Sequence, residues 1–294
     1  MQNNILIELS YINIDKELLR ESKNKSLFSI LTETIKSAKG KERQKIESLI
    51  TKVEHYGLKS LEIVDYTNNN PPNGSGSGFC GIAFKDANGN VGISYRGTEN
   101  MFVNNKNQSD MIDNILASIF GKSEQIREAN EFFQANKDPN GNNYLFGHSK
   151  GGNLSLNTYV SNSDEIKKVN VVNAQPLNDY VLTESQRKAL LDNEKINATI
   201  IEGDIISFIG LPGYLYRLVT FDPSSTEEHE FDDNHSIWSI LFDGVNYVDS
   251  NRQYYKSEMG AKQLALSAFM SYAVEGIQKW GRDNPEQESH GYHF

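Results

Sequence analysis

One serine in the sequence lies between glycines at a spacing that suits nucleophilic catalysis. Residues 143 to 157 read NYLFGHSKGGNLSLN, so Ser149 has a glycine two positions before it and two positions after it. Tyr144-Leu145-Phe146 has the character of a buried strand, and a helix is expected from Gly151 to Val160. A nucleophile elbow needs this order of strand, sharp turn and helix, with glycines where side chains would collide. The placement favours Ser149 as a nucleophile over an ordinary tight turn.

A serine hydroxyl is a weak nucleophile and needs a base, usually a histidine that a carboxylate orients. In one common chain order the acid and then the base follow the serine. His235 lies between a polar loop and an apolar segment, which suits a base carried on a loop. His229 stands among glutamates, and His290 and His293 lie in a polar tail, so His235 is the preferred candidate.

The candidate acid is an aspartate that follows an expected strand. Asp204 comes shortly after the strand Ala198 to Ile201, and side chains at that end of a strand face the side of the sheet where active sites form. Asp179 and Asp222 also follow apparent strands. From the residues alone, Asp204 leads these two alternatives only narrowly.

Apolar runs and helical stretches alternate along most of the chain, which predicts an α/β protein with a mostly parallel central sheet and helices on both faces. Strands are expected at residues 79–84, 91–95, 144–146, 169–172, 198–201 and 215–221. Helices are expected at residues 151–160, 184–191 and 266–277, and one helix or a pair of helices at residues 110–135. Asn88-Gly89 suits a tight hairpin turn between the first two strands.

The N-terminal part reads differently from the rest. Apolar residues recur at helical spacing between residues 15 and 57, which predicts a helical N-terminal segment over residues 1–67. The polar stretch at residues 68–78 is expected to be a surface loop, and residues 79–280 the α/β core. Two isolated helices would form a poor domain alone, so residues 1–294 are predicted to form a single domain.

Composition narrows the class of protein. The net charge of −10, from 29 basic and 39 acidic residues, argues against a nucleic acid partner. Cys80 is the one cysteine, so an internal disulfide is excluded. No apolar run is long enough for a membrane span, and the start lacks the pattern of a secretory signal. We expect a cytoplasmic protein, or one exported by a route without a cleaved signal peptide.

Several separated stretches resemble the class 3 lipases and a related bacterial group of lipase-like α/β hydrolases. They cover roughly residues 80 to 240 in matching order. The stretches are ISYRGTE at 93–99, GHSKGG at 147–152, VVNAQPLND at 171–179, GDIISFIGLP at 203–212 and NHSIW at 234–238.

The resemblance implies an α/β-hydrolase fold and a Ser-His-Asp triad. Carried over position by position, it makes Ser149 the nucleophile, Asp204 the acid and His235 the base. It also implies an oxyanion hole from Thr98 and the backbone N–H of Lys150. Neither a metal nor an organic cofactor is required.

Other residues of these stretches carry weaker implications. Arg96 is expected to be structural, because a buried guanidinium must be paired. The sequence departs from the lipases at Ser207, where they tend to have proline, at the inserted Gln175, and at Met111, where they have an aromatic residue. These departures put any substrate inferred from fungal triacylglycerol lipases in doubt.

The expected substrate is an ester with a fatty acyl chain. Residues 101–121 occupy the place of the lipase lid, and they fit a helix packed on the sheet equally well. A second apolar stretch, residues 208–218, follows the acid and is a candidate lining for an acyl pocket. A lipid or acyl-ester substrate and transient contact with a membrane surface are therefore predicted; the sequence indicates no particular protein partner. The alternatives are an acyltransferase and a non-catalytic protein that keeps the fold to bind a lipid or a partner.

Overall fold

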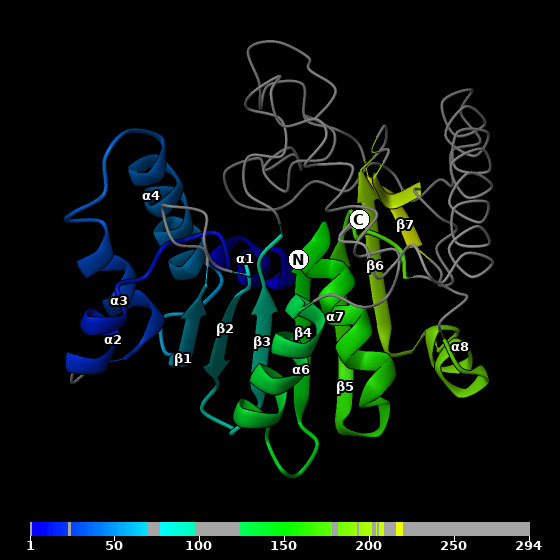
Figure 1. Ribbon diagram of the computed structural model, residues 1–294. Coiled ribbons are helices and arrows are strands. Elements are labelled where there is room, and N and C mark those ends of the chain that lie inside the picture. The colour runs from blue at the N-terminus through cyan, green and yellow to red at the C-terminus, as the bar shows by residue number, and fades with distance from the viewer. Residues whose placement is uncertain are drawn as a thin grey trace, which may run out of the picture.

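The centre of the structure, a computed structural model, is a seven-stranded sheet (Figure 1). The structure describes residues 2–22, 25–69, 77–97, 124–177, 182–192, 194–201, 204, 206–208 and 216–219. Within these residues the strands lie side by side in the order in which they occur in the chain. They are β1 (Glu62–Asn68), β2 (Cys80–Lys85), β3 (Val91–Tyr95), β4 (Asn143–His148), β5 (Ile166–Val172), β6 (Ile196–Ile201) and β7 (Tyr216–Val219).

Most of this sheet is parallel, as predicted. Strand β2 runs antiparallel to both β1 and β3, and the strands from β3 to β7 are parallel to one another. The hairpin between β2 and β3 turns at Gly89, whose positive φ of 87° is the conformation the sequence led us to expect there. Parallel pairing brings the carboxyl ends of β3, β4, β5 and β6 to one edge of the sheet.

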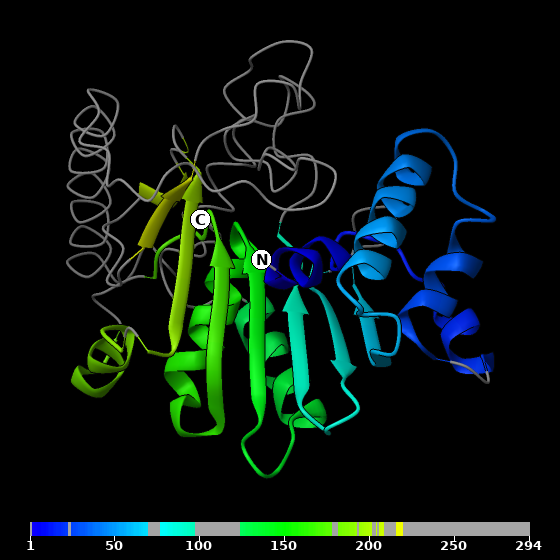
Figure 2. The same cartoon turned by 180° about the vertical axis from the view of Figure 1, so that it is seen from behind.

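Helices cover both faces of the sheet. Figures 1 and 2 show α6 and α7 on one face and α1 on the other, with α2, α3 and α4 beside β1. The helices are α1 (Gln2–Leu9), α2 (Lys16–Glu21), α3 (Leu27–Thr34), α4 (Gly40–His55), α6 (Glu124–Asn136), α7 (Lys150–Ser161) and α8 (Glu184–Leu190). Within the described part of the chain, no helix combines the length and the apolar character needed to cross a membrane.

Alternation along β4 divides the apolar side chains between the two faces. Leu145 packs with the helices α6 and α7, whereas Phe146 packs with α1 and α4 in a second cluster. Successive side chains of a strand point to opposite faces, so one strand supplies both cores. The uninterrupted apolar run Tyr144-Leu145-Phe146 therefore follows from burial on both sides.

The N-terminal segment is helical only in part, and this corrects the expectation for residues 1–67. Its last residues form the edge strand β1, in which Ile63 and Tyr66 are buried and Val64 is exposed. The pairing of β1 with β2 shifts register between Ile63 and Asp65. This irregularity puts two buried residues three positions apart, which is also the spacing of a helix face.

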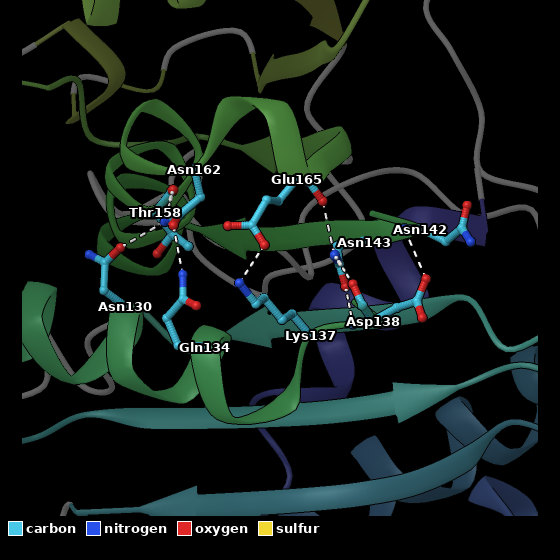
Figure 3. A network of polar contacts seen from close by, with 9 residues as sticks. All are labelled: Asn130, Gln134, Lys137, Asp138, Asn142, Asn143, Thr158, Asn162 and Glu165. Atoms are coloured by element: carbon cyan, nitrogen blue, oxygen red, sulfur yellow. Dashed lines mark hydrogen bonds and ion pairs between the residues drawn. The ribbon is translucent and has the colours of Figure 1, made fainter. Parts of the chain in front are cut away.

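The sheet end opposite Ser149 is fixed by side-chain hydrogen bonds (Figure 3). Asn143, the first residue of β4, donates from its amide to the carbonyl oxygens of Asp138 and Glu165, and accepts from the Asp138 N–H. Glu165 also pairs with Lys137 at the end of α6. These contacts anchor the start of β4 to the segments on either side.

A buried ion pair joins α1 to α4. The Lys52 ammonium lies 2.8 Å from one Glu8 carboxylate oxygen and 3.0 Å from the other, and the two side chains are 7% and 1% exposed. Removing one partner of such a pair leaves an uncompensated buried charge.

We predict that Lys52→Met lowers the free energy of unfolding by about 3–5 kcal/mol. The matched control is Lys36→Met, because Lys36 pairs with Glu33 at 2.7 Å on the surface, and this change should cost less than about 1 kcal/mol. Adding Glu8→Leu to Lys52→Met should recover part of the loss. Chemical denaturation of the four proteins checks this, and equal losses in the two lysine variants would contradict it.

Candidate active site

Ser149 lies in a sharp turn between the strand β4 and the helix α7. Its φ of 57° and ψ of −126° place it in a region that residues with a side chain rarely occupy. The turn is held by backbone hydrogen bonds: the Ser149 N–H donates to Val172 at 3.2 Å, and the Ser149 carbonyl oxygen accepts from Asn153 and Gln175, each at 3.1 Å. The strand, turn and helix predicted from the sequence are therefore all present.

The glycines around Ser149 are required by close backbone approaches. A Cβ atom at Gly147 would lie 2.2 Å from the Gly151 carbonyl oxygen, and one at Gly151 would lie 2.1 Å from the Tyr95 carbonyl oxygen. A Cβ at Gly152 would lie 2.5 Å from the Cβ of Ala174. All three positions exclude any larger residue unless the backbone shifts. The glycines occur at this spacing because the turn packs closely against itself, against β3 and against the segment after β5.

The helix α7 begins at Lys150, directly after the turn. The first N–H groups of a helix have no acceptor within the helix, and the helix dipole makes this end positive. The backbone N–H of Lys150 is one of these groups, so the turn supplies a donor beside Ser149. The expectation for this N–H in an oxyanion hole is compatible with the geometry.

The Lys150 side chain is buried as well, with 7% of the residue exposed. Burial lowers the pKa of its ammonium group from 10.5 to about 8. From the sequence, a role in the site was predicted only for the backbone N–H of Lys150.

The end of β3 lies against the turn. Gly97 follows β3 by two residues, and a Cβ atom there would lie 3.1 Å from the Ser149 Cβ and 2.7 Å from the His148 carbonyl oxygen. Thr98, the other predicted oxyanion donor, is the next residue in the chain but lies outside the described residues.

Arg96, the residue before Gly97, is buried and fully engaged, as predicted for a structural arginine. Its guanidinium donates to the carbonyl oxygens of Ser10 and Ile12, the latter at 3.0 Å, and to Oδ1 of Asn13 at 3.0 Å. It also donates to the Tyr66 hydroxyl at 3.5 Å. The N-terminal segment therefore holds the end of β3.

Asp204 is buried just beyond β6, with 1% of the residue exposed. Its carboxylate accepts from the backbone N–H of Ile206 at 3.2 Å, from the N–H of Ser207 at 3.0 Å, and from the Ser207 hydroxyl. Ser149 and Asp204 follow strands separated only by β5, and strands in a sheet are about 5 Å apart. The structure therefore places these two predicted residues at the same edge of the sheet, two strands apart.

Ser207 was noted in the sequence only as a departure from a lipase proline. In the structure it supplies an N–H and a hydroxyl to Asp204, and a proline could supply neither. The departure therefore adds hydrogen bonds to the candidate acid.

Several sequence predictions lie outside the described residues. They are the base His235, the alternative acids Asp179 and Asp222, the lid candidate 101–121 and the helix expected at 266–277. Within the described residues, no group of histidine, cysteine and acidic side chains is arranged to hold a metal ion.

Comparison with known proteins shows the family to which the chain belongs. The family model described as Mbeg1-like, a lipase-like family, matches residues 53–250, which is two thirds of the chain and includes the turn at Ser149. The chain belongs to the Mbeg1-like family. No curated protein matches the sequence.

The match to the Mbeg1-like family begins within α4 and leaves out residues 1–52, yet one residue of that part reaches the site. The Tyr11 hydroxyl lies 2.6 Å from Nδ1 of His148 and accepts from the Gly97 N–H at 3.2 Å. Sequence reasoning missed Tyr11, because it is 137 positions from its partner and belongs to none of the recognised stretches.

The backbone of Ser149 gives a first test of the site. Because its φ and ψ favour glycine, we predict that Ser149→Gly is more stable than Ser149→Ala by about 1–3 kcal/mol. Ser155, in the middle of α7, serves as the control, since there glycine should be less stable than alanine by about 1 kcal/mol. Thermal unfolding of the four variants measures both differences, and the same sign at both positions would refute a strained turn.

The Lys150 side chain gives a second test. Between pH 8 and 10.5 the unfolded chain holds a proton that the folded chain has lost, so the free energy of unfolding should rise with pH in this window. The rise, on the order of 3 kcal/mol, should be absent from Lys150→Met. Below pH 8 the variant should be the more stable protein, because both states of the wild type carry the charge and only the folded state buries it.

Urea denaturation at a series of pH values measures the two profiles. Lys188→Met, a change at an exposed lysine of α8, is the matched control and should follow the wild type. Parallel profiles for the wild type and Lys150→Met would contradict the assigned burial of this charge.

Proposed function

We propose that the protein is a serine ester hydrolase with an α/β-hydrolase fold, which cleaves esters of fatty acids through an acyl-enzyme. The observation that carries the proposal is the backbone of Ser149, a residue with a side chain held at φ 57° between β4 and α7. Such backbone strain persists where the surrounding structure enforces it, and it is concentrated at functional sites. A turn of this kind places the serine hydroxyl at the carboxyl end of its strand, on the side of the sheet where active sites form.

In the proposed reaction, His235 takes the proton from the Ser149 hydroxyl while Oγ attacks the carbonyl carbon of the ester. The carbonyl oxygen becomes an oxyanion, which the N–H of Lys150 and the Thr98 residue stabilise. When the intermediate collapses, the C–O bond to the alcohol breaks and His235 gives its proton to the leaving oxygen. Water then attacks the acyl-enzyme by the same route, releasing the fatty acid and restoring Ser149.

Asp204 is the proposed partner of His235. Its carboxylate is buried and fixed by three donors from Ile206 and Ser207, so it can hold an imidazole in one orientation. It follows β6, and only β5 lies between β6 and β4, the strand that leads to Ser149, so both residues lie at the same edge of the sheet. This support comes from the geometry of Ser149 and Asp204, and the role of His235 rests on the sequence.

Substrate class rests on apolar segments of the sequence. Residues 101–121 follow the oxyanion strand and residues 208–218 follow the acid, and both are rich in large apolar side chains. In the proposed enzyme they contact the acyl chain and, transiently, a lipid surface.

The test is hydrolysis of p-nitrophenyl esters of increasing acyl length. Ser149→Ala, Asp204→Asn and His235→Asn should each lower kcat by at least about 10³-fold, because the members of a triad act as a unit. Activity of the wild type should increase from acetate to medium or long acyl chains. Asp86→Asn is the matched control, since Asp86 accepts hydrogen bonds in the turn between β2 and β3 and should be replaceable without loss of kcat.

Three results would change the proposal. A wild type without esterase activity, with and without detergent, would favour a non-catalytic protein of the same fold. Loss of activity in Asp179→Asn but not in Asp204→Asn would show that the acid is the other aspartate. Release of the acyl group to an added alcohol in preference to water would indicate an acyltransferase.

A further inference from the structure

The Tyr11 hydroxyl lies between the end of β3 and the turn that carries Ser149. It accepts from the Gly97 N–H at 3.2 Å and is 2.6 Å from Nδ1 of His148, the residue before Ser149. The two rings meet edge to face, with centroids 5.8 Å apart. One phenol therefore contacts the backbone just after β3 and the side chain just before Ser149.

The segment around Tyr11 is itself fixed to β3. Arg96 donates to the carbonyl oxygens of Ser10 and Ile12, which flank Tyr11, and to the side chain of Asn13. These bonds hold the backbone on both sides of Tyr11. The end of β3, which carries Arg96, therefore fixes the position of the Tyr11 hydroxyl. Arg96 therefore orders residues 10–13, and Tyr11 in turn orders Gly97, the residue after Arg96.

The hydrogen bond to Tyr11 also occupies the Gly97 N–H, which lies close to Ser149. The Gly97 N–H donates to the Tyr11 oxygen, so this N–H is already engaged and does not serve as an oxyanion donor. The approach at Gly97 is close, because a Cβ atom there would lie 2.5 Å from the Tyr11 oxygen and 3.1 Å from the Ser149 Cβ.

We propose that Tyr11 is a positioning residue for the turn that carries Ser149 and the Lys150 N–H, the described donor of the oxyanion hole, acting through the Gly97 N–H and the His148 ring. This inference rests on the proposed function, and it assigns a catalytic purpose to the N-terminal segment. In the absence of the hydroxyl, the Gly97 N–H and the His148 ring lose their shared partner, and the turn places the Lys150 N–H, an oxyanion donor, less accurately. Misplacement of such donors weakens binding of the transition state while leaving binding of the ground state nearly unchanged.

The test is Tyr11→Phe, which keeps the ring and removes only the hydroxyl. Its matched control is Tyr159→Phe, because the hydroxyl of the buried Tyr159 donates to the Ala189 carbonyl oxygen at 3.2 Å, away from the site. We expect kcat of Tyr11→Phe to fall by about 10- to 100-fold on an ester that the wild type hydrolyses, with KM changed by less than about threefold. Tyr159→Phe should keep the kcat of the wild type, although the melting temperatures of both variants fall by similar amounts.

A second readout separates positioning from loss of structure. A trifluoromethyl ketone with the same acyl chain bonds reversibly to the serine Oγ, and its carbonyl oxygen then becomes an oxyanion. Its inhibition constant should rise in Tyr11→Phe by the factor by which kcat falls, because both measure the oxyanion hole. A purely structural role would lower the amount of folded enzyme and leave this constant unchanged.

The outcomes are distinguishable. Unchanged kcat in Tyr11→Phe, or a fall matched by Tyr159→Phe, would overturn the role of Tyr11 while leaving the proposed function intact. A wild type that hydrolyses no ester would overturn both. If Tyr11→Phe fails to fold, Asn13→Ala tests the same link at an exposed side chain, and kcat should fall by about two- to fivefold at an unchanged melting temperature. An unchanged kcat in Asn13→Ala would then contradict the proposal.

Discussion

The backbone contact between β3 and the start of α7 is the constraint on which the rest of the site depends. A Cβ atom at Gly151 would lie 2.1 Å from the Tyr95 carbonyl oxygen, so the helix can begin where it does only with glycine at that position. Because Gly147 makes a similar approach within the turn, Ser149 has no space in which to relax from its positive φ. The strain of the serine is therefore imposed by the packing of two main chains, and the same packing brings the end of β3 next to the serine.

The N-terminal segment belongs to this arrangement. Arg96 is buried at the end of β3, and its charge is satisfied largely by carbonyl oxygens of residues 10–13. On the same face of the sheet, the ion pair between Glu8 and Lys52 ties α1 to α4. An unpaired buried charge on Arg96, Glu8 or Lys52 would destabilise the fold. Both sets of contacts therefore require the N-terminal segment to be in place. In our account the segment completes the core and orders the oxyanion strand together.

The sequence was sufficient for those parts of the structure that depend on local pattern. Glycines at fixed offsets from Ser149 predicted the elbow, and an aspartate just past an apolar run predicted where Asp204 would lie. It was insufficient where the determinant is a contact between distant residues. The edge strand β1 pairs with β2 through an irregular register that no local pattern marks, and Tyr11 contacts His148, 137 positions away, without belonging to a recognised motif. Ser207 could be recognised as unusual, but its two bonds to Asp204 follow only from the fold.

The central claim is that Ser149 is an activated nucleophile. Reaction of the purified protein with a fluorophosphonate, followed by mass spectrometry of the intact chain and its peptides, tests it most directly. We predict one probe per chain, attached to the peptide that contains Ser149, and no attachment in Ser149→Ala. A wild type that stays unlabelled both in buffer and with detergent, or one labelled at another serine, would contradict the account.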